Sequence, residues 1–164
     1  MKTEIGEYVV GAYLKQVQRC DVVDYNVRPP GGGMEGLGEI DIVGLRFSDT
    51  TVYLCESATH LQGLEYGKGY DDSFERVKKK LDRQRQHAEK HLASFQPRHF
   101  MFWSPVVPRG RLLEALKGID GLELVVNEDY KARIEELRAL ARKTIADTGN
   151  PFFRTLQLLE RLRG

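Results

Sequence analysis

Two apolar runs separated by a short polar break dominate the hydrophobic pattern of the chain. The first reads Gly-Glu-Ile-Asp-Ile-Val-Gly-Leu-Arg-Phe from Gly38, and the second reads Val-Tyr-Leu-Cys-Glu-Ser-Ala-Thr-His up to His60. Ser-Asp-Thr-Thr lies between them. Such runs around a polar turn predict a β-hairpin over residues 38–60. Two carboxylates, Asp41 and Glu56, lie among its apolar residues.

The relative placement of the two carboxylates follows from the length of the turn. If residues 48 and 49 form a two-residue turn, Val43 faces Leu54, and Asp41 faces Glu56 on the same side of the sheet. Two like charges so placed repel, so one carboxyl takes up a proton or a cation lies between them. A divalent metal ion is the simplest such cation. The alternative is a carboxylate pair at the edge of a cleft, where water weakens the repulsion.

The apolar periodicity of the other segments predicts an α/β fold with a central mixed sheet flanked by helices. Apolar residues recur at helical spacing over five segments, with Thr3 as the expected cap of the first helix and Asp72 or Ser73 as that of the second. We expect helices over residues 3–19, 71–95, 108–117, 128–147 and from Pro151 onward, and further strands over 21–28, 98–107 and 122–126.

The composition is that of an ordinary globular protein. The chain has 164 residues, 41% hydrophobic and 30% charged, which fits a single domain over 1–164. Its apolar runs are too short to cross a bilayer and its first residues do not resemble a signal peptide, so we expect a cytoplasmic protein with no membrane partner. The net charge of +1 leaves only a local basic patch as a possible nucleic-acid contact.

Three other patterns are interpreted as structural. Glycines between residues 31 and 36 have the spacing of a dinucleotide-binding motif, but the next predicted element is a strand rather than the helix that this motif requires. His87 and His91 have a zinc-binding spacing without an apparent third ligand, so we interpret them as surface histidines. Trp103 and Cys55 fall in apolar strands and are expected in the core.

Charged residues on two predicted helices extend the pattern around the hairpin. Glu7 lies near the edge of the apolar stripe of the first helix, where it either caps the helix start or faces the sheet. The long helix carries the densest basic run of the chain. Lys80 and Gln84 fall on its inner side and can reach back over the sheet. The outward cations are either an ordinary solvated face or a nucleic-acid contact formed by Lys78, Lys79 and Arg83.

The order helix, three strands, helix, strand resembles the PD-(D/E)xK nuclease superfamily, whose fold is restriction-endonuclease-like. The specific part of the resemblance is the string Gly38-Glu39-Ile40-Asp41-Ile42-Val43 followed by Leu54-Cys55-Glu56. The resemblance covers residues 3–107. Residues 108–164 form an addition of a further strand and C-terminal helices.

This resemblance implies a Mg²⁺-dependent (or Mn²⁺-dependent) nuclease, a hydrolase that acts on DNA rather than RNA. By similarity, Asp41, Glu56 and the carbonyl of Ser57 bind the ion, and Glu7 assists through water. Carboxylate oxygens suit Mg²⁺, which keeps several water ligands and needs few protein groups. A bound metal ion lowers the pKa of water and neutralises charge at the phosphate.

One position departs from the superfamily pattern. The motif lysine belongs two residues after the glutamate, where this chain has Ala58, and Ala58 faces the further carboxylate of Glu39 in the predicted register. Lys80, with Gln84 beside it, can replace that lysine from the following helix, as happens elsewhere in the superfamily. His60 is a second candidate for this role, because a continued strand would place it on the same side as Glu56 and Ala58. If neither serves, the chain is a catalytically inactive nuclease-like module for nucleic-acid binding or protein interaction.

The C-terminal helices predict an interaction surface. The last predicted helix carries Phe152, Phe153, Leu156, Leu159 and Leu162. So much apolar surface on a short helix must be covered by the body of the domain or by another chain. We therefore expect either packing onto the core, docking onto a larger complex, or a homodimer formed through these helices.

Overall fold

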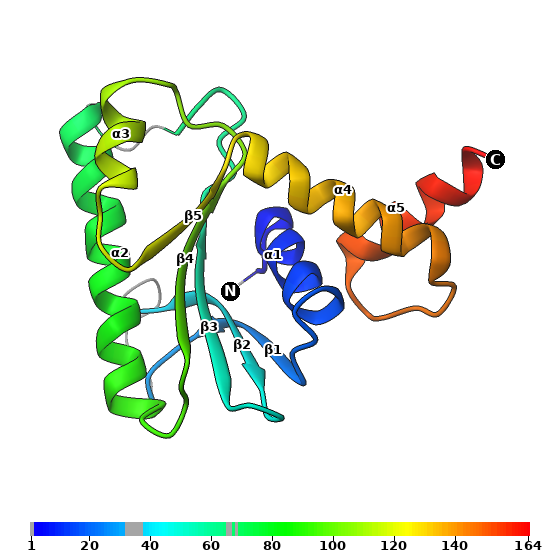
Figure 1. The fold of residues 1–164 in the computed structure, drawn as a ribbon, viewed down its shortest axis with the longest axis horizontal. Helices are drawn as coiled ribbons and strands as arrows, with labels where there is room; N and C mark the ends of the chain where they lie inside the picture. Colours follow the sequence, from blue (N-terminus) through cyan, green and yellow to red (C-terminus); the bar gives the residue numbers. More distant parts are fainter. Residues whose placement is uncertain (1, 32–37, 65–66, 68) are drawn as a thin grey trace.

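Helices alternate with strands along most of the chain, and the computed structural model describes residues 2–31, 38–64, 67 and 69–164. Most of the predicted glycine segment, residues 32–37, lies outside the described residues. The elements are α1 (Ile5–Gln16), β1 (Val22–Val27), β2 (Ile40–Arg46), β3 (Thr51–Ser57), α2 (Tyr70–His91), β4 (Arg98–Ser104), α3 (Arg111–Lys117), β5 (Leu122–Val126), α4 (Glu128–Lys143) and α5 (Pro151–Leu162) (Figure 1).

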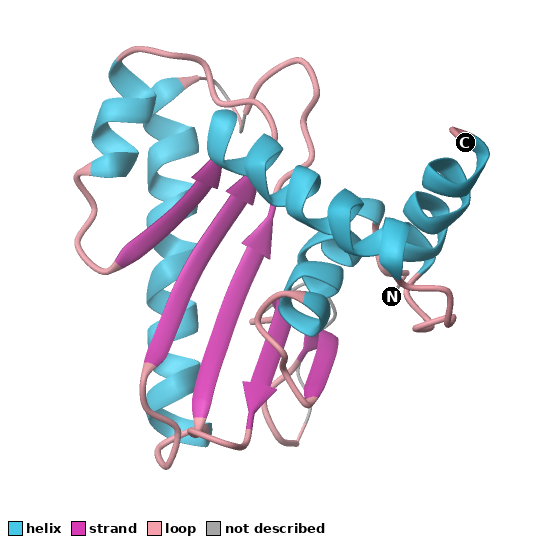
Figure 2. Ribbon diagram, turned by 45° about the vertical axis from the view of Figure 1, so that its right-hand side comes forward, coloured by secondary structure: helices cyan, strands magenta, loops and turns pink. Residues whose placement is uncertain are grey.

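The five strands form one mixed sheet in the order β1-β2-β3-β4-β5 (Figure 2). Strand β2 is antiparallel to both β1 and β3, whereas β3, β4 and β5 run parallel to one another. Parallel neighbours need a crossover connection, and α2 and α3 provide the two crossovers. The predicted α/β class, the mixed sheet and the order of the elements are confirmed.

The register of the hairpin is the predicted one, because Val43 pairs with Leu54 and Ile42 pairs with Cys55. Its ends are shorter than predicted. Residues 47–50 form the turn between the strands, and β3 ends at Ser57. His60 therefore lies beyond the strand, so strand parity does not apply to it, and its catalytic role stays a prediction.

Helices cover both faces of the sheet. Helices α2 and α3 lie on one face, and α1 and α4 lie on the other, with α5 packed against α1 and α4 (Figure 1). A buried cluster on the α1 side includes Trp103, Cys55 and Phe153. A second cluster, beneath α2 and α3, includes Val77 and Phe102. Trp103 and Cys55 are thus core residues, as predicted.

Several helix ends differ from the prediction. The cap of α1 is Glu4 rather than Thr3, and α2 begins after Gly69 rather than at Asp72 or Ser73. Glycine suits this position because its φ of 116° is unfavourable for other residues. Helix α5 starts at Pro151 as predicted.

Only one of the two histidines predicted to lie at the surface does so. His87 is buried in the α2 interface, so its interpretation as a surface histidine is wrong, whereas His91 is exposed. Burial, with His91 nearby, lowers the pKa of His87. Among the described residues, no helix combines the length and apolar character needed to cross a membrane.

Candidate active site

The two hairpin carboxylates and a lysine from α2 meet on the α2 side of the sheet. The Lys80 ammonium lies 2.5 Å from Oε2 of Glu56 and 3.8 Å from Oδ2 of Asp41. Asp41 comes from β2 and Glu56 from β3, and each lies directly beside the last ladder pair, Ile42 and Cys55. The chain itself therefore supplies a cation, the Lys80 ammonium, beside the two acidic side chains.

A main-chain group orients Asp41. The N–H of Ser57 donates to Oδ2 of Asp41 at 3.0 Å, which fixes the aspartate against the end of β3. The contact confirms that Ser57 lies next to Asp41. Its predicted role as a carbonyl ligand of a metal stays a prediction.

Glu56 is the most deeply buried carboxylate of the site, with 1% of its surface exposed. Burial raises the pKa of Glu56 to about 8, and the nearby Asp41 adds to this effect while Lys80 opposes it. One of its oxygens, Oε2, accepts a hydrogen bond from Lys80, but the other, Oε1, is buried without a partner among the described residues. A buried carboxylate oxygen without a donor is a group that a cation or a water molecule can satisfy.

Glu7 is buried at the start of α1, where it caps the helix and also lies near this region, so both of its interpretations hold. Its Oε2 accepts from the N–H of Glu4 at 3.0 Å and from the Asn26 amide at 3.5 Å. Burial raises the pKa of Glu7, the hydrogen bond from Glu4 opposes the increase, and the charge of Asp41 adds to it. Glu7 is therefore near enough to Asp41 to share its electrostatic environment.

Gln84 lies one turn beyond Lys80 on α2, but its side chain contacts β4 rather than the carboxylates. Its amide donates to the carbonyl of Met101 in β4 at 3.1 Å, within the helix–sheet interface. Its Oε1 is buried without a partner in the described part of the chain. The structure brings Lys80 to the carboxylates and uses Gln84 to fasten α2 to β4. Its predicted catalytic role stays a prediction.

The predicted nucleic-acid residues on α2 are not equivalent. Lys78 and Lys79 are exposed, and the Lys78 ammonium lies 5.6 Å from the centre of the Phe74 ring. Arg83 is half-buried and donates to the main-chain carbonyl of Glu39 at 3.3 Å. Lys78 and Lys79 are thus available to a ligand, whereas Arg83 also stabilises the chain just before β2.

Arg28 was missed by the sequence analysis. It forms an ion pair of 2.7 Å with the buried carboxylate of Glu39, which neutralises the further acid expected beside Ala58. Val27 pairs with Ile40, so the next residues along each strand, Arg28 and Glu39, are neighbours across the two strands. Opposite charges at such a position are the signal for this pair, but the long connection between β1 and β2 hides their register in the sequence.

The donor set at the site fits a magnesium ion, although it is small. Within the described residues, no group of three or more histidine, cysteine, aspartate or glutamate side chains forms a metal-binding cluster. Asp41 and Glu56 nevertheless present hard oxygen donors, and Oε1 of Glu56 has no competing partner there. Mg²⁺ is commonly held by one or two carboxylates with water completing its coordination.

Known proteins supply no further information about the site. Comparison of the chain with models of protein families, with curated proteins and with solved structures found no match.

Proposed function

We propose that the chain is a Mg²⁺-dependent phosphodiester hydrolase of the PD-(D/E)xK type, acting on DNA, with a restriction-endonuclease-like core. The observation that supports this most strongly is the position of the Lys80 ammonium between Asp41 and Glu56. Ala58 leaves the site without a lysine on β3, and Lys80 brings an equivalent charge from α2. The α1-β1-β2-β3-α2-β4 order is a second, weaker support.

Each of the three side chains has a role in this proposal. Asp41 and Glu56 hold the ion, which when bound neutralises charge at the phosphate and lowers the pKa of a coordinated water. The Lys80 ammonium donates hydrogen bonds to oxygen atoms that become more negative as the phosphodiester bond breaks. Glu7 accepts hydrogen bonds at the edge of the site and can orient water there.

The cation at Lys80 also shapes the binding of the ion. In the absence of metal, the ammonium stabilises one oxygen of Glu56 while the other stays available. A bound ion would repel the Lys80 ammonium, whose charge would then be available to a substrate phosphate. A positive charge would therefore lie beside the two carboxylates both with and without the metal ion.

Cleavage of supercoiled plasmid DNA in the presence of Mg²⁺ or Mn²⁺ tests the proposal. Wild-type protein is expected to nick or linearise the plasmid, and EDTA is expected to abolish this activity. Asp41→Asn and Glu56→Gln keep the size of the side chains and are expected to lower the rate at least about 100-fold. Undiminished cleavage by both well-folded variants would remove these residues from catalysis.

A catalytically inactive nuclease-like module is the second candidate, and the same ion pair favours it. The 2.5 Å contact between Lys80 and Glu56 places a positive charge beside the buried carboxyl group without a metal ion. In this case the chain binds nucleic acid equally well in EDTA and in Mg²⁺, and cleaves neither DNA nor RNA. Binding to an oligonucleotide in both buffers, measured by fluorescence anisotropy, separates the two candidates.

A further inference from the structure

Helix α5 is apolar on two opposite faces, although only one of them is covered. Phe153 and Leu156 are buried in the interface with α1 and α4. On the other side, Leu158 and Leu162 are 58% and 74% exposed. A helix with apolar residues on all sides is normally buried on all sides, so the outer face of α5 is suited to contact with another molecule.

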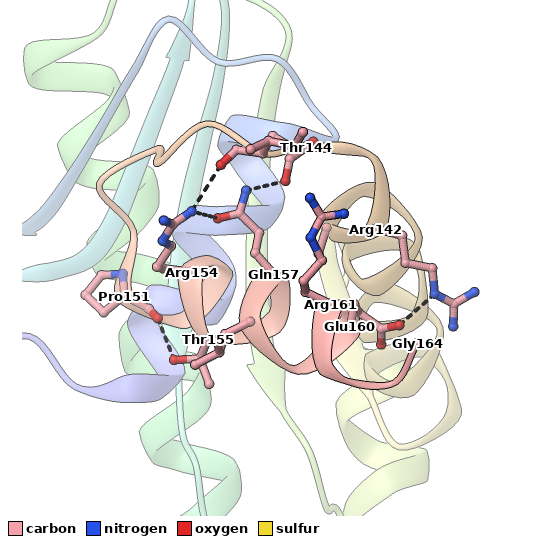
Figure 3. Close-up of a pocket in the computed structure, with 12 residues that line it drawn as sticks. Arg142, Thr144, Pro151, Arg154, Thr155, Gln157, Glu160, Arg161 and Gly164 are labelled. Carbon is pink, nitrogen blue, oxygen red and sulfur yellow. Dashed lines mark hydrogen bonds and ion pairs between the residues drawn. The ribbon is translucent and has the colours of Figure 1, made fainter.

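A groove of about 730 Å³ lies beside this face, between α5, the end of α4 and the connection that joins them (Figure 3). Its apolar lining includes Ile145, which is 76% exposed, and Leu158. Pro151 closes one part of the lining at the start of α5. An apolar groove next to the exposed Leu158 and Leu162 has the shape and chemistry to bind a helix.

The charged side chains that line the groove are mostly positive. They are Arg142, Arg154 and Arg161, with Glu160 as the acidic side chain among them. The Glu160 side chain is only 4% exposed and accepts hydrogen bonds from Arg138 and Arg142, which lower its pKa. Its charge is therefore already matched, and the groove presents an excess of positive charge.

Arg161 is the cation best placed for a ligand. Its side chain is drawn beside Gln157 and Arg142 without a dashed line, and its guanidinium makes no hydrogen bond or ion pair with the described residues (Figure 3). Arg154, by contrast, donates to the carbonyl of Ile145 and to Gln157. The guanidinium of Arg161 is thus free to form a bidentate pair with a carboxylate.

We propose that this groove binds an amphipathic helix of a partner protein whose apolar face is flanked by acidic residues. Leucine or similar side chains of the partner would cover Ile145, Leu158 and Leu162, and its carboxylates would pair with Arg161 and Arg154. A second copy of α5 fits less well, because it would bring the arginines of the two copies together without a free carboxylate between them. A nucleic acid would leave the exposed leucines uncovered.

Selection from a phage-displayed library of random 16-residue peptides, with the full chain as the target, tests this proposal. We expect the enriched peptides to have apolar residues at helical spacing, a net negative charge, and mutual competition for one site. Synthetic versions are expected to lose at least about tenfold in affinity towards Leu158→Ser and Arg161→Glu. Replacing one peptide glutamate by lysine is expected to restore binding to Arg161→Glu.

Matched controls separate the groove from the rest of the surface. Leu61→Ser removes another exposed leucine side chain, and Lys117→Glu reverses an exposed charge on α3. Both are expected to bind the peptides with wild-type affinity. Failure to enrich peptides, enrichment of basic peptides, or equal binding to all variants would overturn the proposal.

Two further measurements distinguish the other possible occupants of the groove. Concentration-dependent dimerisation that Leu162→Ser abolishes, measured by sedimentation, would favour a second copy and overturn the proposal. A DNA duplex that binds wild type but not Arg161→Glu and displaces the peptides would also overturn it. The groove does not include Asp41 or Glu56, so these results are independent of nuclease activity.

Discussion

The ammonium of Lys80 lies 2.5 Å from the carboxylate of Glu56, although one residue belongs to a helix and the other to a strand. The same ammonium is 3.8 Å from Asp41. A single cation from α2 thus lies between two acids that face each other across the hairpin. This contact links the electrostatics of the buried pair to its proposed catalytic role.

Replacement of Lys80 is expected to affect catalysis more than binding. Lys80→Met keeps the length of the side chain but removes its charge, so it no longer stabilises developing negative charge at the phosphate. We expect Mg²⁺-dependent cleavage to fall by about 100-fold or more, with less than about a threefold change in the concentration of DNA that half-saturates the enzyme. Steady-state cleavage of a labelled duplex measures both quantities.

Lys90→Met is the matched control, because Lys90 is an exposed lysine near the end of the same helix. It is expected to cleave at the wild-type rate. Equal rates for Lys80→Met and wild type would contradict the proposed role of Lys80.

The buried Glu56 predicts that the metal-free protein becomes less stable as the pH rises. Its pKa is about 8 in the folded protein, against an ordinary value of 4.5. The folded state therefore keeps a proton that the unfolded state loses, and this stabilisation is complete below pH 4.5 and is lost on the way to pH 8. We expect a decline on the order of 2 to 5 kcal/mol in the free energy of unfolding across this window.

Urea unfolding in EDTA between pH 5 and 9 measures this decline. Glu56→Gln cannot titrate, so most of the pH dependence is expected to disappear in this variant. The raised pKa of Glu7 contributes a smaller slope of the same sign, and the lowered pKa of His87 opposes it at the acidic end of the range. Identical slopes in wild type and Glu56→Gln would show that Glu56 does not hold the proton.

The ion pair between Arg28 and Glu39 is expected to stabilise the fold. Arg28→Ala leaves the buried Glu39 carboxylate without its partner at 2.7 Å, so we expect a loss of about 1 to 3 kcal/mol in the free energy of unfolding. Chemical denaturation measures the loss. Removing both side chains in Arg28→Ala/Glu39→Ala is expected to recover part of it.

Lys117→Ala is the control for this prediction, because its pair with Glu114 is exposed on both sides. We expect a change below about 0.5 kcal/mol for this variant. A loss in Arg28→Ala no larger than that of Lys117→Ala would indicate that the Arg28 pair adds nothing to stability.

The exposed Lys78 and Lys79 on α2 are expected to bind nucleic acid by electrostatic attraction to its phosphates. Lys78→Glu and Lys79→Glu reverse charges that face solvent, so each should weaken the binding of a DNA duplex and lessen its dependence on salt concentration. Fluorescence anisotropy at several salt concentrations in EDTA measures both effects. Affinity and salt dependence identical to wild type would place the nucleic-acid contact elsewhere.

The register of the hairpin could be predicted because local patterning determines it. A shift by one residue would move the apolar side chains of β2 and β3 to the opposite face, so the pairing of Val43 with Leu54 was fixed by their burial. The facing of Asp41 and Glu56 followed from this pairing. The reach of Lys80 was predicted only as one alternative, because the packing angle of α2 on the sheet depends on tertiary contacts.

Other features depended on contacts between distant segments and could not be predicted. His87 lies three residues after Gln84, on the same side of α2, but its polar ring gave no indication that the helix would bury it. The partner of Glu39 required knowledge of how β1 pairs with β2 across a long connection. The strand parity assigned to His60 did not apply because β3 ends at Ser57.

Calorimetric titration with Mn²⁺, of wild type and of Asp41→Ala, tests most directly whether the two carboxylates bind a divalent ion. Thermal unfolding of both proteins first confirms that each is folded. We predict one binding event per chain for wild type and none for Asp41→Ala in the same concentration range. Equal Mn²⁺ binding by the two proteins, or no binding by wild type, would contradict a metal site formed by Asp41 and Glu56.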